Sequence, residues 1–104
     1  MNDHRIFERF PVDIDARYLN SDTGKEGLAK VQDVSAKGLG LTVSEKLRLS
    51  AALEIWLEMK NKGEPLYARG KVVWEKLTEK NDYRLGVELE KADLMGISRV
   101  FRLA

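Results

Sequence analysis

Two arginines near the start of the chain have the residue type and spacing to hold an anionic ligand. Arg5 and Arg9 are followed by Pro11, and the residue before a proline is pushed out of the α region. In the extended segment expected here, the two Cα atoms lie up to roughly 13 Å apart, at ~3.3 Å per residue. Guanidinium groups bind phosphate bidentately, read the O6 and N7 edge of guanine, and stack on flat bases. The alternative is that both are ordinary solvated charges, balanced by Asp3 and Glu8.

A second polar segment with binding chemistry runs from Asp33 to Gly38. Asp33 and Ser35 are two positions apart at a strand end, so their side chains lean from the same face. A carboxylate accepts from the N1 and N2 hydrogens of guanine, and a hydroxyl bonds a phosphate or an amino group. Gly38 allows the backbone to turn and a ligand to approach closely. The alternative is an Asx or Ser turn that only joins two strands.

Charge and composition limit the class of ligand. The 104 residues carry 18 Lys plus Arg against 17 Asp plus Glu, a formal net charge of +1, and they include no cysteine and the single histidine His4. This excludes disulfides, cysteine zinc sites and histidine clusters, so we expect no metal site. It also disfavours a large basic surface for DNA or RNA polymers. A small dianionic ligand needs two well-placed arginines and not a basic surface.

Alternating apolar residues predict a single all-β domain, a small six-stranded antiparallel β-barrel with a short C-terminal α-helix. Trp74 follows Val72 and Gly70 in one alternating row, so we expect it in the core or at the rim of the barrel. Trp56 falls on the outward face of its strand, under the helix or at a partner surface. The inward rows are Val12, Ile14, Ala16 and Tyr18; Ala29 and Val31; Leu39, Leu41 and Val43; Leu53, Ile55, Leu57 and Met59; Ala68, Gly70, Val72 and Trp74; and Tyr83, Leu85, Val87 and Leu89.

The two ends of the chain are expected to differ from the barrel. Leu94, Ile97 and Phe101 have helical spacing and predict a helix over 93–103. We divide the domain, 1–104, into an N-terminal arm at 1–11 that is mobile until ligand binds, a barrel at 12–90, and the C-terminal helix at 91–104.

Catalysis and membrane insertion find no support in the sequence. The chain has no P-loop, dinucleotide-binding fingerprint or nucleophile elbow, and nothing in it brings His4 into hydrogen-bonding order with Ser35 and Asp33. The mixed charges of the first residues are unlike a signal peptide, and no apolar run approaches the ~18–20 residues of a membrane helix. We therefore expect a cytoplasmic protein that is not an enzyme.

Taken together, the two polar segments form a pattern that resembles the PilZ domain family. This pattern is Arg-x-x-x-Arg just before the first strand and Asp-x-Ser-x-x-Gly between the second and third strands. The Gly-Leu-Gly-Leu run at 38–41, the Val-Val-Trp run at 72–74 and the Leu-Gly-Val run at 85–87 also fall where the family has similar residues. Members of this family bind the bacterial second messenger cyclic di-GMP, and their fold is a six-stranded barrel with a C-terminal helix.

The resemblance implies a role for each residue of the pattern. Arg5 and Arg9 are similar to the arginines that clamp the phosphates and the guanine Hoogsteen edges. Asp33 matches the residue that holds a guanine, Ser35 the small polar contact, and Gly38 the close-packed turn. The ligand would be cyclic di-GMP, with no other cofactor.

His4 departs from the family pattern, because many relatives carry another arginine there, often associated with a stacked ligand dimer. We place His4 as a peripheral ligand residue and leave open whether one or two ligands bind. The resulting hypothesis is a cyclic di-GMP receptor whose arm closes over the dinucleotide and signals to an unidentified partner protein. The alternative is a PilZ-like interaction adaptor that does not use the nucleotide.

Overall fold

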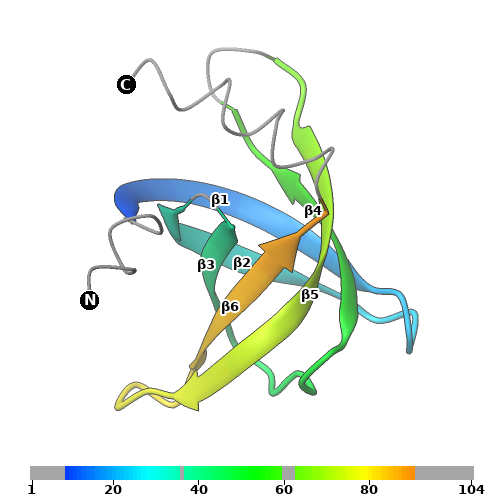
Figure 1. Cartoon of the computed structure of the whole chain (residues 1–104), viewed down its shortest axis with the longest axis vertical. Helices are drawn as coiled ribbons and strands as arrows, with labels where there is room; N and C mark the ends of the chain where they lie inside the picture. Colours follow the sequence, from blue (N-terminus) through cyan, green and yellow to red (C-terminus); the bar gives the residue numbers. More distant parts are fainter. Residues whose placement is uncertain (1–8, 36, 60–62, 91–104) are drawn as a thin grey trace.

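The strands of the computed structural model close into a six-stranded antiparallel barrel (Figure 1), as predicted. The structure describes residues 9–35, 37–59 and 63–90. The strands are β1 (Phe10–Asn20), β2 (Glu26–Val34), β3 (Gly38–Val43), β4 (Ala52–Leu57), β5 (Leu66–Leu77) and β6 (Tyr83–Leu89). β1 begins before the expected start at Val12. The helix expected over 93–103 and most of the predicted arm, with His4 and Arg5, lie outside the described residues.

The order of strands around the barrel is β1-β2-β3-β6-β5-β4, with β1 also paired to β4. Each half of the chain forms an antiparallel meander, β1 to β3 and β4 to β6. The two meanders join twice, through β3 with β6 and through β1 with β4. Closure leaves none of these strands with a free edge, and it makes β3 and β6 lie across the barrel from β1 and β4.

The barrel interior is filled by the alternating apolar residues of all six strands. Burying such side chains stabilises the fold by about 1.5–3 kcal/mol each. The largest fully buried side chains are Tyr18, Val31, Leu41, Leu53, Ile55, Leu57, Val72 and Leu85. Val12, Ile14, Met59 and Tyr83 are half-buried and pack against this core. The inward rows predicted from the sequence are therefore confirmed, apart from Trp74, described below.

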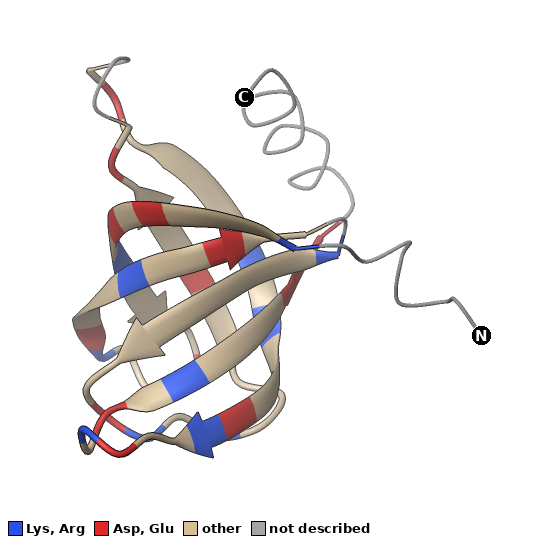
Figure 2. Cartoon of the chain, turned by 90° about the vertical axis from the view of Figure 1, so that its left-hand side faces the viewer, with Lys and Arg blue, Asp and Glu red and all other residues tan. Residues whose placement is uncertain are grey.

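Charged residues alternate with the core residues on the outside of the strands. Figure 2 shows acidic and basic residues interspersed along the strands in view, without a broad area of one sign. Among the residues that the structure describes, no helix is long and apolar enough to cross a membrane.

Among the largest fully buried side chains of the described residues, Tyr18 alone has a polar end, and that end has a partner. The ring is buried, and its hydroxyl donates a hydrogen bond of 2.6 Å to Oε1 of Glu45. Burial raises the pKa of Tyr18 well above its usual range, and the hydrogen bond to the Glu45 carboxylate raises it further. The folded state therefore holds the phenolic proton more strongly than the unfolded chain does.

We expect Tyr18→Phe to lower the free energy of unfolding by about 1 kcal/mol, because Glu45 loses its donor. In the parent, stability should also fall as pH rises above about 10, where the tyrosine ionises only in the unfolded chain. The variant lacks that component, so its stability declines less steeply with pH. Urea unfolding at several pH values measures both effects, with exposed Tyr67→Phe as the control. Equal slopes for Tyr18→Phe and the parent would contradict this role for Tyr18.

Candidate functional site

A row of four residues crosses the outer face of β2, β3, β6 and β5. Asp33 pairs with Gly40, Gly40 with Gly86, and Gly86 with Trp74. The two residues in the middle have no side chains, and the two at the ends have large ones. We call this set the site row.

The two glycines make room for the side chains at the ends of the site row. A Cβ atom on Gly40 would lie 2.6 Å from each carboxylate oxygen of Asp33, and a Cβ on Gly86 would overlap the indole nitrogen of Trp74. The carboxylate and the indole therefore lie against the sheet, directly over the glycine positions. Both glycines are buried beneath them.

Irregularities in two strands direct these side chains outward. The register shifts between Val31 and Asp33 on β2, and between Val72 and Trp74 on β5. A bulge inserts one extra residue and reverses the alternation beyond it. The prediction that Trp74 continues the inward row after Val72 was therefore wrong: the bulge at Val73 places the half-buried indole on the outside of the barrel.

Arg9 connects the two ends of the site row. Its Nη1 atom lies 3.5 Å from Oδ1 of Asp33, and its guanidinium carbon lies 5.6 Å from the ring centroid of Trp74, within cation–π range. The Asp33 side chain is only 14% exposed, whereas that of Arg9 is 51% exposed. The second arginine of the predicted motif thus lies over the candidate site and remains open to solvent.

Arg84 is a member of the site that the sequence analysis missed. Its Nη2 atom donates to Oδ2 of Asp33 at 3.3 Å, so Asp33 lies between two guanidinium groups. The Nε atom of Arg84 is buried and has no hydrogen-bond partner among the residues that the structure describes. The sequence position of Arg84 could have indicated this role. Arg84 alternates with the inward residue Leu85, so it shares the outward face of β6 with Gly86.

Ser35 and Gly38 form the turn between β2 and β3. The Ser35 amide donates to the Gly38 carbonyl at 2.9 Å, and the Ser35 hydroxyl oxygen accepts from the amides of Lys37 and Gly38, each at 3.3 Å. A Cβ on Gly38 would overlap the carbonyl oxygen of Val87. Both residues therefore belong to a tight hydrogen-bonded turn, and the close approach at Gly38 is to the backbone of β6.

A cavity of about 260 Å³ lies on the outer face of the barrel beside the site row. Arg9, Asp33, Ser35, Gly38 and Trp74 all line it. The structure thus brings together four of the predicted ligand residues, while Arg5 and His4 lie outside the described residues. In the described part of the chain, no three His, Cys, Asp or Glu side chains gather as a metal site would require.

Comparison with known families identifies the fold that carries this site. A model of the PilZ domain matches residues 3–103. The chain belongs to the PilZ domain family. No curated protein matches the sequence significantly.

Solved structures similar to this PilZ domain share its fold at low sequence identity. The PilZ domain with c-di-GMP of YcgR from Escherichia coli is 12% identical with a TM-score of 0.67, covering 90% of this chain and 86% of that one. The K. pneumonia MrkH–c-di-GMP complex is 14% identical with a TM-score of 0.66, covering 88% and 47%. The PilZ domain of CeSA from a cellulose-synthesizing bacterium is 19% identical with a TM-score of 0.61, covering 92% and 97%.

The packing of Trp74 over Gly86 gives a prediction that needs no ligand. In Gly86→Ala, the added methyl group displaces the indole from the sheet and separates it from Arg9. We expect the indole N–H resonance of Trp74 to move in a ¹H–¹⁵N NMR spectrum. The resonance of Trp56, which pairs with Tyr67 near the start of β5 and not with the site row, should keep its position as an internal control. An unchanged Trp74 resonance would contradict the described packing.

Proposed function

We propose that this PilZ domain is a non-catalytic receptor for cyclic di-GMP. The observation that carries the proposal is the meeting of Arg9, Asp33 and Trp74 around one cavity, with Ser35 and Gly38 on its wall. Structures similar to this domain include a PilZ domain with c-di-GMP and a MrkH–c-di-GMP complex, which supports the same ligand class here.

The side chains of the site match the functional groups of a guanine nucleotide. The Asp33 carboxylate accepts from the N1 and N2 hydrogens of guanine. The fork of Arg9 bonds O6 and N7 or a phosphate, and the half-buried indole of Trp74 offers a flat surface for stacking. Arg9, Arg84 and Lys37 stand against the carboxylates of Asp33 and Glu88 around the cavity, so the site carries one positive charge in excess, which suits a phosphate group.

Ligand binding at this site requires an exchange of partners at Asp33. Arg9 is half exposed, and its ion pair with Asp33 is long at 3.5 Å. Such a pair is worth about 0–1 kcal/mol, less than the charge-assisted bonds that replace it at about 1.5–3 kcal/mol each. In the proposed complex Arg9 turns to the nucleotide, while Arg84 stays on the other oxygen of Asp33 and holds the carboxylate toward the base.

Arg5 belongs to the proposal through the sequence motif alone. An extended segment places it up to roughly 13 Å from Arg9, a span that suits two phosphates or the two ends of one dinucleotide. Closure of this arm over the ligand would present a changed surface to a partner protein. His4, next to Arg5, is proposed as a peripheral contact, and the stoichiometry of a calorimetric titration distinguishes one bound ligand from two.

Calorimetric titration of cyclic di-GMP into the full chain tests the receptor function. We expect binding by the parent, and at least a tenfold loss of affinity, about 1.4 kcal/mol, in Arg9→Ala, in Asp33→Ala and in the Arg5 and Arg9 double variant. Arg17→Ala is the matched control, because Arg17 also stacks on a tryptophan but lies on the opposite side of the barrel.

The titration also separates the receptor from the adaptor alternative. An adaptor that does not use the nucleotide gives no binding heat with the parent. That result, or Arg9→Ala and Asp33→Ala variants that bind as tightly as the parent, would overturn the proposed function.

The second role to test is that of Arg84 in orienting Asp33. We expect Arg84→Gln to weaken cyclic di-GMP binding roughly tenfold, because Asp33 loses the partner that it keeps when Arg9 turns to the ligand. Lys76→Gln is the control, because Lys76 pairs with Arg84 across β5 and β6 and carries the same charge. Equal losses in the two variants would show that only net charge matters.

A further inference from the structure

A second row of outward residues crosses the barrel on the side away from the site row. Leu28 on β2 pairs with Arg17 on β1, Arg17 with Trp56 on β4, and Trp56 with Tyr67 on β5. We call these four residues the aromatic row. Its central strands, β1 and β4, lie opposite β3 and β6 in the ring of strands, so the aromatic row and the cavity at Asp33 face in different directions.

The Arg17, Trp56 and Tyr67 side chains of the aromatic row stack in sequence, and the row leaves much apolar surface in water. The Arg17 guanidinium carbon lies 5.3 Å from the Trp56 ring centroid, and the Trp56 and Tyr67 centroids are 5.4 Å apart with the rings tilted by 51°. Leu28 is 75% exposed and Tyr67 is 40% exposed. Trp, Tyr and Arg are the residues that contribute most of the binding energy at protein interfaces.

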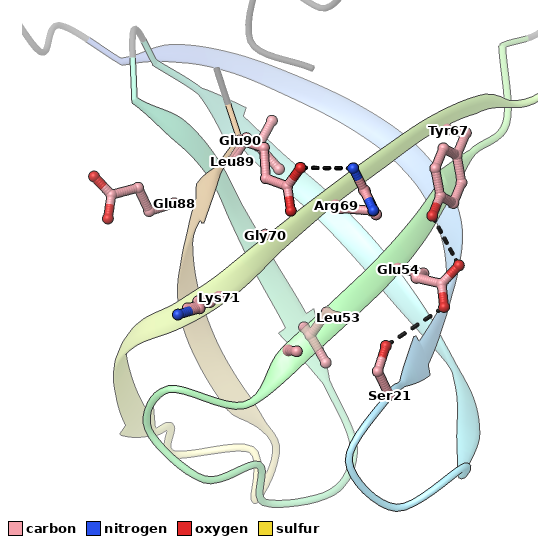
Figure 3. Close-up of a pocket in the computed structure, with 11 residues that line it drawn as sticks. Ser21, Leu53, Glu54, Tyr67, Arg69, Gly70, Lys71, Glu88, Leu89 and Glu90 are labelled. Atoms are coloured by element: carbon pink, nitrogen blue, oxygen red, sulfur yellow. Dashed lines mark hydrogen bonds and ion pairs between the residues drawn. The ribbon is translucent and has the colours of Figure 1, made fainter. Parts of the chain in front are cut away.

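A cavity of about 390 Å³ adjoins the Tyr67 end of the aromatic row, between β4, β5 and β6. Figure 3 shows Glu54 in its wall, with the hydroxyl groups of Tyr67 and Ser21 directed at its two carboxylate oxygens, at 2.8 and 3.4 Å. These neutral donors orient the carboxylate. The cavity lining holds three carboxylates, of Glu54, Glu88 and Glu90, against the two cations of Arg69 and Lys71, so one negative charge is in excess. Arg69 is also the register partner of Glu54 across β4 and β5. Arg69, on the same wall, forms an ion pair with Glu90 at 2.8 Å.

Acidic residues outnumber basic ones around the aromatic row. Glu26 and Glu58 lie on the outward faces of β2 and of the end of β4, and neither forms an ion pair within the described part of the chain. Lys30, the nearest lysine on β2, already bridges Asp13 and Asp15. With Arg17 and Arg69 counted, five carboxylates stand against three cations on this face: Asp13, Asp15, Glu26, Glu54 and Glu58 against Arg17, Lys30 and Arg69. This excess of negative charge favours lysine or arginine over the phosphates of a nucleic acid.

We propose that the aromatic row and its adjoining cavity bind a partner protein through a basic, apolar segment. An apolar side chain of the partner packs on Leu28 and Trp56, and a Lys or Arg side chain enters the cavity to pair with Glu54. The closed ring of described strands offers no free edge to which a partner could add a strand. The partner must therefore be bound through side chains. The two cavities share Glu88 of β6 as a wall residue, but Glu54 and the aromatic row lie away from Asp33, Arg9 and Trp74. We therefore expect use of this surface not to depend on cyclic di-GMP binding.

NMR titration of the full chain with two model peptides tests this surface. The probes are Ac-Lys-Leu-Arg-Leu-Lys-NH₂ and its acidic counterpart, Ac-Glu-Leu-Glu-Leu-Glu-NH₂. We expect the basic peptide to move the indole resonance of Trp56 and the methyl resonances of Leu28 at millimolar concentration, and to leave Trp74 in place. The acidic peptide should move none of them.

Variants separate the charge from the apolar contact. Glu54→Gln removes the charge but keeps an acceptor oxygen for the Tyr67 hydroxyl, while its amide N–H can donate to the Ser21 hydroxyl oxygen. We expect this variant to bind the basic peptide about tenfold more weakly. Glu79→Gln, in the exposed turn between β5 and β6, is the control with the same charge change and should bind like the parent. Cyclic di-GMP titration into Glu54→Gln should match the parent, which keeps failure of this proposal distinct from failure of the receptor function.

Several results would overturn the proposal. One is the absence of any shift at Trp56 with the basic peptide, which would also be the outcome if another part of the chain covered the surface. A second is equal binding of the acidic peptide or stronger binding of a single-stranded oligonucleotide. A third is a Trp56 resonance that moves with protein concentration alone, because that assigns the surface to a second copy of this chain.

Discussion

The pairing of β3 with β6 is the contact on which both the fold and the candidate site depend. It joins the two meanders into a closed ring, and it does so with Gly40 opposite Gly86 and with Gly38 against the carbonyl oxygen of Val87. No side chain fits at these positions. The absence of side chains lets β3 and β6 approach their neighbours closely. It also leaves bare backbone against which the Asp33 and Trp74 side chains lie.

The barrel presents two arginine–tryptophan pairs with different surroundings. Arg9 and Trp74 lie beside a cavity with Asp33, where a second arginine leaves positive charge in excess. Arg17 and Trp56 lie on the opposite face among carboxylates. Stacking of a guanidinium on an indole supplies similar contact energy in both places. The neighbouring charges therefore decide which face suits an anionic nucleotide and which suits a basic segment of protein.

The separate charge balance of the two faces explains which ligands a nearly neutral net charge disfavours and which it allows. A formal charge of +1 disfavours long nucleic acids, whose binding depends on many cations acting together. It does not prevent the capture of a small dianion, because a few oriented donors suffice at short range. The structure shows such local imbalance on each face, with both signs interspersed over the barrel as a whole.

The sequence by itself determined the number and inward faces of the strands, because alternation with period two is a local property that burial of one face preserves. It also placed Arg9, Asp33, Ser35 and Gly38 as candidate site residues, since their motif lies in short continuous segments. Only the tertiary structure decided that Trp74 lies outside the barrel, that Arg84 adjoins Asp33, and that Leu28, Arg17, Trp56 and Tyr67 form one row. Each of these depends on bulges and on register between strands distant in sequence, and a shift of one residue moves a side chain to the opposite face.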